Sequence, residues 1–361
     1  MRPDQFNYDA YHKRCEQVNE RAKQFVKGDF LPVSQWTLGD GVYGNACRDR
    51  KEILPKMLDG ITRTIQTDND WLPYLEPWHG IGVYAEAFGC PFEWNDTDAP
   101  WTRTIISDVE GLKRLEKPDI QKSEMLKMVL DTTEYFNEQT KGRIYIAPTD
   151  TQSPLSTMSL ICDVTWMLTE AWDYPEEFHR ALGLITDLII EFSLTQRKYC
   201  SKPAAPGHTM WSPEGFDGIS LSDDMLALIG SEFYREFGLP YDQKISDALG
   251  GIGVHSCGNW SHNFMAAREL SNIVMIDLAI SYVWDPDPNI PAKIIRGFGG
   301  TNVPVQVRCD PSDTALIDQL LASGVKVMLS YWWDEDPAKR KHTYEDTKTR
   351  WERLRIKKTV H

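Results

Sequence analysis

Eight short apolar runs recur along the chain, and a helical pattern follows each of them. Strands that alternate with helices are typical of parallel sheets, and strands buried on both faces are almost continuously apolar. Polar residues gather at the C-terminal ends of these runs, where parallel α/β folds carry their chemistry. The pattern predicts a (β/α)8 TIM barrel. The expected strands span residues 30–36, 71–76, 143–150, 216–222, 251–257, 272–280, 303–311 and 325–331.

An open doubly wound sheet is the structural alternative. The glycine-rich segment at residues 39–45 follows the first expected strand, but it has neither the GxGxxG order nor the GxxxxGK[ST] order. The nucleotide-binding version of that fold is therefore disfavoured. Residues 9–28 are patterned like a surface helix, and residues 1–29 are predicted to form an N-terminal helical extension. Residues 30–361 are predicted to form one barrel domain, a length common for this fold.

The charge balance limits the choice of partner. The chain has 53 acidic and 39 basic residues and a net charge of −14, which argues against binding nucleic acid or an anionic membrane. It shows no signal-peptide core and no apolar run of membrane-spanning length. Seven scattered cysteines without a CxxC pair disfavour a disulfide framework. We expect a soluble cytoplasmic protein, for which a homodimer is one compatible state.

The segment Gly251–Trp260 carries the strongest candidate site. His255 and Cys257 are two residues apart at the end of an expected strand, so both side chains emerge on the same face. Imidazole and thiolate suit Zn²⁺, and a catalytic zinc site needs three protein ligands and one open position. Cys309, at the end of another expected strand, is the predicted third ligand, although an inert buried thiol is an equally good interpretation. Glu76 and Asp277 are alternative ligands.

Other residues are predicted to meet at the mouth of the barrel, which is formed by the C-terminal ends of its strands. They are Trp36, Glu76, His79, Asp150, Asp217, Asp223, Asp277 and Tyr331. Asp217, Asp223 and Asp224 could equally cap the helix expected to begin at Met225, and for Asp223 or Asp224 capping is the favoured interpretation. His79 and His208 lie in loops, where a surface role is the default, and His179 lies in a helical pattern and is expected to be structural.

Several segments together resemble a known family. They are Ala85–Cys90, Pro154-Leu155, Asp173–His179, Phe233–Tyr241, Val254–Gly258 and Asp310-Pro311. In order and spacing they resemble the uroporphyrinogen decarboxylase superfamily, and within it the cobalamin-dependent methyltransferase branch. The resemblance covers residues from about Phe30 to Trp333 and implies a (β/α)8 barrel.

Two features distinguish the branches. Decarboxylases carry an arginine-bearing segment near the N-terminus, and the matching residues 35–41 of this chain contain no arginine. The methyltransferase branch carries HxCG, as residues 255–258 do. That branch has its last zinc ligand, a cysteine, close to the final strand, where residues 329–333 offer none. Cys309 is the candidate substitute.

The resemblance implies an enzyme that moves a methyl group between a small molecule and a corrinoid (cobalamin) cofactor on a partner protein, assisted by Zn²⁺ as a Lewis acid. Under this hypothesis Glu76 and Asp217 handle protons or contact the substrate. Trp36, Trp211 and Trp332 form an aromatic wall, and His79, Asp277 and Tyr331 are further substrate contacts. A metal-free decarboxylase-like lyase is the first alternative. A barrel without catalysis that binds a small molecule or a corrinoid protein is the second.

Overall fold

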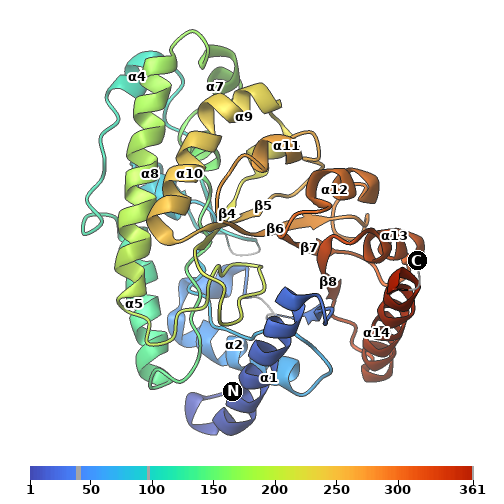
Figure 1. The fold of residues 1–361 in the computed structure, drawn as a ribbon. Helices are drawn as coiled ribbons and strands as arrows, with labels where there is room; N and C mark the ends of the chain where they lie inside the picture. The colour runs from blue at the N-terminus through green and yellow to red at the C-terminus, as the bar shows by residue number, and fades with distance from the viewer. Residues whose placement is uncertain (38–41, 96–97, 360–361) are drawn as a thin grey trace.

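A parallel sheet of six strands forms the centre of the computed structural model, which describes residues 1–37, 42–95 and 98–359. The apolar runs form these strands as expected, because a strand covered on both faces needs apolar side chains on both. Their order is β1-β8-β7-β6-β5-β4, and Figure 1 shows them fanned across the middle of the molecule. The strands are β1 (Val33–Trp36), β4 (Ile219–Ser222), β5 (Ile252–His255), β6 (Ile273–Ala279), β7 (Pro304–Arg308) and β8 (Lys326–Trp332).

Two of the eight expected strands do not form regular ladders. The segments at 71–76 and 143–150 are joined by one parallel bridge, between Leu75 and Ile146, and a second bridge joins Ile146 to Pro203. Prolines 73, 77 and 148 lie in or beside these segments, and proline lacks the N–H that a ladder requires. The N–H of Asp70 donates to the carbonyl of Val33, so the extended segments fill the interval between β4 and β1.

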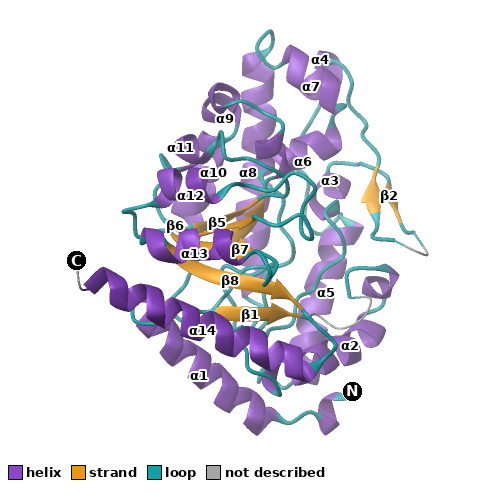
Figure 2. Ribbon diagram, turned by 90° about the vertical axis from the view of Figure 1, so that its right-hand side faces the viewer, coloured by secondary structure: helices purple, strands orange, loops and turns teal. Residues whose placement is uncertain are grey.

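Helices cover the outer face of the strands (Figures 1 and 2). Expected helices are present with similar bounds, and the prolines separate them, since α8 begins at Pro175 and Pro240 lies in the first turn of α10. The α-helices are α1 (Tyr8–Lys27), α2 (Arg50–Ile65), α3 (Val83–Ala87), α4 (Val109–Lys113), α5 (Glu124–Gln139), α6 (Pro154–Ile161), α7 (Val164–Glu170), α8 (Pro175–Arg197), α9 (Ser231–Phe237), α10 (Leu239–Leu249), α11 (Phe264–Ala267), α12 (Pro291–Phe298), α13 (Thr314–Ser323) and α14 (Pro337–Thr359).

A few small elements were not anticipated from the pattern. They are α3, the hairpin of β2 (Phe92–Glu93) and β3 (Trp101–Thr102), and the 3-10 turns η1 (Pro3–Gln5), η2 (Asn45–Arg48) and η3 (Asp224–Ala227). Each has at most five residues, which is too short for a hydrophobic period to be recognisable.

The N-terminal helix shares a core with the barrel. The ring of Phe25 on α1 packs edge-on against the buried ring of Trp211, with centroids 5.6 Å apart. Asp70, fully buried, bonds Arg21 of α1 at 2.6 Å and Lys348 of α14 at 2.7 Å. Figure 2 shows α14 beside β1. Within the described ranges, every helix is too short or too polar to cross a lipid bilayer.

Candidate functional site

A cavity of about 320 Å³ opens at the C-terminal ends of the strands. This is the edge at which parallel barrels place their active sites. The side chains around it come from strand ends and loops far apart in sequence. They are Tyr43, Trp78, Asp150, His208, Thr209, His255, Cys257, Trp284, Gln306, Arg308, Ser330 and Trp332.

Three potential metal ligands meet beside this cavity. His255 is the last residue of β5, Cys257 follows it, and Asp224 begins η3 directly after β4. Sγ of Cys257 lies 3.7 Å from Nε2 of His255, and one ligand atom from each of the three residues lies within 4.8 Å of the others. The N–H of Cys257 donates to Oδ1 of Asp224 at 2.7 Å, which fixes the carboxylate to the loop that carries the thiol.

The backbone turns sharply after the thiol. Gly258 has a φ of +79°, which favours glycine, and a Cβ there would lie 3.0 Å from the Cβ of Ala227. The Gly258 N–H donates to Asp285. The Gly-Asn turn expected from the sequence thus directs Cys257 toward the cavity.

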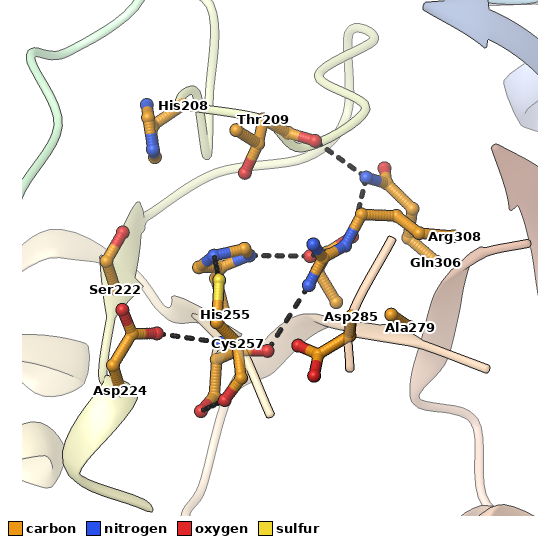
Figure 3. A network of polar contacts seen from close by, with 12 residues as sticks. His208, Thr209, Ser222, Asp224, His255, Cys257, Ala279, Asp285, Gln306 and Arg308 are labelled. Atoms are coloured by element: carbon orange, nitrogen blue, oxygen red, sulfur yellow. Dashed lines mark hydrogen bonds and ion pairs between the residues drawn. The ribbon is translucent and has the colours of Figure 1, made fainter. Parts of the chain in front are cut away.

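A row of buried polar side chains orients the imidazole. His255, Asp277 and Gln306 are register partners on the adjacent strands β5, β6 and β7. Nδ1 of His255 donates to Oδ2 of Asp277 at 2.6 Å, and Nε2 of Gln306 donates to Oδ1 at 2.8 Å. Arg308 adds an ion pair to Asp277 at 3.0 Å. Figure 3 shows Arg308 and Gln306 together beside His255. With Nδ1 committed to the carboxylate, Nε2 is the nitrogen that faces Cys257.

These contacts shift the pKa values of both His255 and Asp277. Burial opposes the charged form of His255, but the hydrogen bonds to Asp277 and Cys257 and the charge of Asp277 outweigh it and raise its pKa to about 10. Burial likewise opposes ionisation of Asp277, but Arg308 and His255 outweigh it and lower the pKa of that carboxyl. The row therefore places a negative charge permanently behind the imidazole.

The donor set fits zinc. Ligand bonds of about 2.3 Å to sulfur and about 2.0 Å to nitrogen, at a tetrahedral angle, place the two atoms about 3.6 Å apart. The observed separation of Cys257 Sγ and His255 Nε2 is 3.7 Å. A carboxylate behind the ligating imidazole is the usual arrangement at zinc sites, and Asp277 provides it.

Cys309 does not join this group. It follows β7 with the parity of Val305 and Val307, on the opposite face from Gln306 and Arg308, and all three apolar side chains belong to the core beneath the helices. The thiol is fully buried, and burial raises its pKa well above the usual value. This position does not fit the prediction of Cys309 as third ligand, and Asp224 is the residue that lies within reach of His255 and Cys257.

A second polar cluster lies across the cavity. Nδ1 of His208 donates to Oε1 of Glu76 at 2.7 Å, and Nε2 lies 3.5 Å from Oδ1 of Asp150. Tyr43 donates to the other oxygen of Glu76 at 3.0 Å. The rings of His208 and His255 are nearly perpendicular, with centroids 6.3 Å apart. Glu76 is thus near the mouth as predicted, and His208 is buried rather than on the surface.

An aromatic wall lies on the third side. Trp284 and Trp332 stack face to face, with centroids 3.8 Å apart and planes 8° from parallel. Arg308 lies 5.8 Å from the Trp284 ring, close enough for a cation–π contact. Trp332 is 48% exposed and lines the cavity, and its contact with a substrate stays a prediction.

A family comparison now adds to this geometry. The model of the uroporphyrinogen decarboxylase (URO-D) family matches residues 78–312, more than half of the chain. The chain belongs to the uroporphyrinogen decarboxylase family. The matched range includes Asp224, His255 and Cys257. The family resemblance predicted from the sequence is confirmed.

Two relatives come from Methanosarcina mazei. A methylated-thiol–coenzyme M methyltransferase is 24% identical over 189 residues, which are 51% of this chain and 47% of that protein. The chain thus spans about half the length of this curated relative. A solved methyltransferase structure has a TM-score of 0.66 and 15% identity, and the match covers 93% of this chain and 99% of that one. This likeness confirms the α/β barrel fold.

Several predicted site residues of this family member lie elsewhere. Trp211 is fully buried and its Nε1–H donates to the carbonyl of Asp70, so it packs in the core. Tyr331 is buried toward α14, where its hydroxyl contacts Thr347. Asp217 is exposed before the start of β4, at the opposite end from the mouth, and accepts from the N–H of Gly218. These three are corrected to structural or surface positions.

The other predicted contacts have mixed positions. His79 is 1% exposed, its Nε2 contacts Thr132 at 3.0 Å, and it does not line the cavity. Asp277 is fully buried behind His255 and supports the site without facing it. For Trp36 only the backbone at the end of β1 is described, so its substrate contact stays a prediction.

Sequence reasoning also misses residues that line or adjoin the cavity. The sequence pattern favours a helix cap for Asp224 and a surface position for His208. Arg308 and Trp284 had no assigned role. One signal was present for Arg308, because it directly precedes Cys309 and alternates with it at the end of a strand. Loop residues such as His208 carry no comparable periodic signal.

Proposed function

We propose that this chain is a methyltransferase that moves a methyl group between a small molecule and a corrinoid cofactor, with zinc at Asp224, His255 and Cys257. The observation that carries the proposal is the three-ligand group beside a cavity, with its imidazole oriented by Asp277. Membership of the uroporphyrinogen decarboxylase family and the methyltransferase names of both relatives support it.

The cavity size bears on the corrinoid. A volume of about 320 Å³ is at the lower end of small-molecule pockets and is far too small for a whole corrin macrocycle. The small molecule would occupy the cavity, and the corrinoid would be presented at its mouth. This supports a separate corrinoid protein as partner. Free cysteines throughout the described chain accord with a reducing cytoplasm.

The residues of the chain have distinct tasks in this proposal. Bound Zn²⁺ would supply Lewis acidity that stabilises negative charge on a sulfur or oxygen of the substrate. Asp277 and Gln306 keep the His255 ring fixed, with Nε2 toward the cavity. The Trp284–Trp332 pair offers a flat apolar surface for the body of the substrate and excludes water from the reacting atoms.

Metal content tests the proposal directly. Purified wild-type protein should hold about one zinc per chain, and Cys257→Ser and Asp224→Asn should each lose most of it, because a site of three protein ligands rarely survives removal of one. Cys309→Ser is the matched control, since it changes a buried thiol outside the group and should keep the zinc. Methylation of free cob(I)alamin should be lost in parallel with zinc.

Contrary results would separate the alternatives. A wild type without zinc that decarboxylates an acidic substrate would contradict the proposal in favour of a metal-free lyase. If the wild type transfers no methyl group and Cys257→Ala leaves its ligand affinity unchanged, the chain is a binding protein. Loss of zinc in Cys309→Ser with zinc retained in Asp224→Asn would restore the cysteine as third ligand.

A further inference from the structure

One buried charged cluster has no part in holding the metal. Glu76 and Asp150 are 1% and 3% exposed, and both face His208. They come from the two irregular segments of the barrel, and His208 comes from the loop before β4. Two buried carboxylates and an imidazole are costly to maintain away from water, and a fold that needs only packing would fill this space with apolar side chains.

Both ring nitrogens of His208 face carboxylate oxygens. Nδ1 lies 2.7 Å from a Glu76 oxygen and Nε2 lies 3.5 Å from an Asp150 oxygen, and carboxylate oxygens only accept. Burial opposes the charged ring, but the charges of Asp150 and Glu76 and the hydrogen bond to Glu76 outweigh it and raise the pKa of His208. The two carboxylates thus favour the protonated form of a ring that lines the cavity.

The contact of Nε2 with its carboxylate is the weaker of the two. The Nε2 contact with Asp150, at 3.5 Å, is at the limit of hydrogen bonding. Asp150 already accepts from neutral donors, which are Ser222 at 2.9 Å, Gln152 at 3.1 Å and Trp78 at 3.2 Å. The Nε2–H can therefore transfer its hydrogen bond to a ligand without leaving Asp150 unpaired.

The loop holds His208 in a fixed place. Gly207 has a φ of +86°, and a Cβ there would lie 2.6 Å from Pro148, so the loop approaches the irregular segment as closely as glycine allows. Gln306 donates to the carbonyl of Thr209 at 2.6 Å and to Asp277 at 2.8 Å. The Gln306 side chain thus connects the loop that carries His208 to the buried polar row beside His255. Figure 3 shows His208 and Thr209 across from His255.

We propose that His208 is a catalytic residue that gives its Nε2 proton to the heteroatom losing the methyl group, an inference that rests on the proposed methyl transfer. In this step the bond between the methyl carbon and the heteroatom breaks, and its electron pair stays on the heteroatom. The reduced corrinoid of the partner supplies the electron pair of the new bond to carbon. The heteroatom takes the proton from His208, and solvent at the mouth reprotonates the ring.

The role of His208 indicates a class of substrate. Protonation helps most when the leaving group is a strong base, as an alkoxide or phenolate is, and not at all when it departs as a neutral molecule. A donor with an oxygen-bound methyl group on an aromatic ring would use both the proton donor and the flat Trp284–Trp332 surface.

A series of para-substituted methoxybenzenes tests proton donation by His208, with free cob(I)alamin as the methyl acceptor. Trimethylsulfonium is the control donor, because its leaving group departs as a neutral molecule and needs no proton. In His208→Gln we expect methoxybenzene demethylation to fall about 100-fold or more, while the sulfonium rate changes little. The loss should shrink as the leaving group becomes less basic. His179→Gln on α8, a half-exposed histidine paired with Glu236, is the matched control and should behave as wild type.

Each other outcome has a definite meaning. Equal losses with methoxybenzenes and sulfonium in His208→Gln, at unchanged zinc content and melting temperature, would overturn the proton-donor role. A wild type that accepts only donors with neutral leaving groups would overturn it as well. A wild type that demethylates none of the probes would contradict the proposed methyl transfer itself. Asp150→Asn is a second variant, and it should show the same leaving-group dependence as His208→Gln with a smaller loss.

Discussion

The two sides of the mouth are built differently. From β4 to β1 a continuous ladder fixes the register, so His255, Asp277 and Gln306 fall in one row without further help. Between β1 and β4, single bridges replace the ladder, and side-chain hydrogen bonds to Glu76 and Asp150 connect the segments. On the regular side, backbone hydrogen bonds between strands position the side chains of the site. On the irregular side, hydrogen bonds to the site carboxylates also stabilise the backbone segments that carry them.

The largest effect is expected on the regular side, from Asp277→Ala. The substitution leaves the buried Arg308 and His255 without their shared carboxylate, which should lower the free energy of unfolding by about 3–5 kcal/mol. Urea unfolding measures it. Asp277→Asn, which keeps a partner for Gln306, should lose less. If Asp277→Ala cost no more than a surface substitution, the row would not be a structural unit.

The irregular side should be sensitive to acid through His79. Burial lowers the pKa of His79 to about 4, against about 6.5 in an unfolded chain. Between these values the unfolded chain binds a proton that the folded chain does not, so stability falls as the pH drops through this window, by up to roughly 3 kcal/mol. Urea unfolding at pH 7 and pH 4 should show most of this loss in wild type, and His79→Gln should lack the His79 share of it. An equal pH dependence in both proteins would contradict the assignment.

A smaller effect separates the two faces of β7. Cys309→Ser places a hydroxyl in the apolar layer beneath the helices and should cost about 2 kcal/mol of stability, without change in zinc content. Thermal unfolding and metal analysis of one preparation measure both. Full stability with loss of zinc would place this side chain in the metal site and break the distinction between the faces.

The smallest effect is expected from Tyr43→Phe. The variant loses one hydrogen bond to Glu76, worth about 1 kcal/mol. Because side chains hold this side together, amide hydrogen exchange at residues 71–79 should accelerate while β5 and β6 keep their protection. Uniform acceleration across both sides would show that the ladder and the irregular segments open as one unit.

The candidate ligands Asp224, His255 and Cys257 show which parts of one site can be predicted from sequence. The spacing of His255 and Cys257 at the end of an apolar run predicts that the two side chains lie together, and they do. Strand alternation is only part of the cause, because β5 ends at His255 and Cys257 lies in the turn that follows. The same rule would have placed Cys309 on the outer face had its parity with Gln306 been followed. Asp224 could not be found this way, because it reaches the thiol from the turn after a different strand.

The sequence by itself determined the alternation of strands and helices, the family, and the imidazole–thiol pair, since each depends on periodicity or short spacing along the chain. Only the tertiary structure decided that Asp224, and not Cys309, lies within reach of His255 and Cys257. It also decided that Trp211, Tyr331 and Asp217 lie away from the mouth and that His208 is buried between two carboxylates. The reason is physical. Contacts between side chains on distant loops depend on where the folded chain places those loops. No local pattern of residues encodes the distance between two such loops.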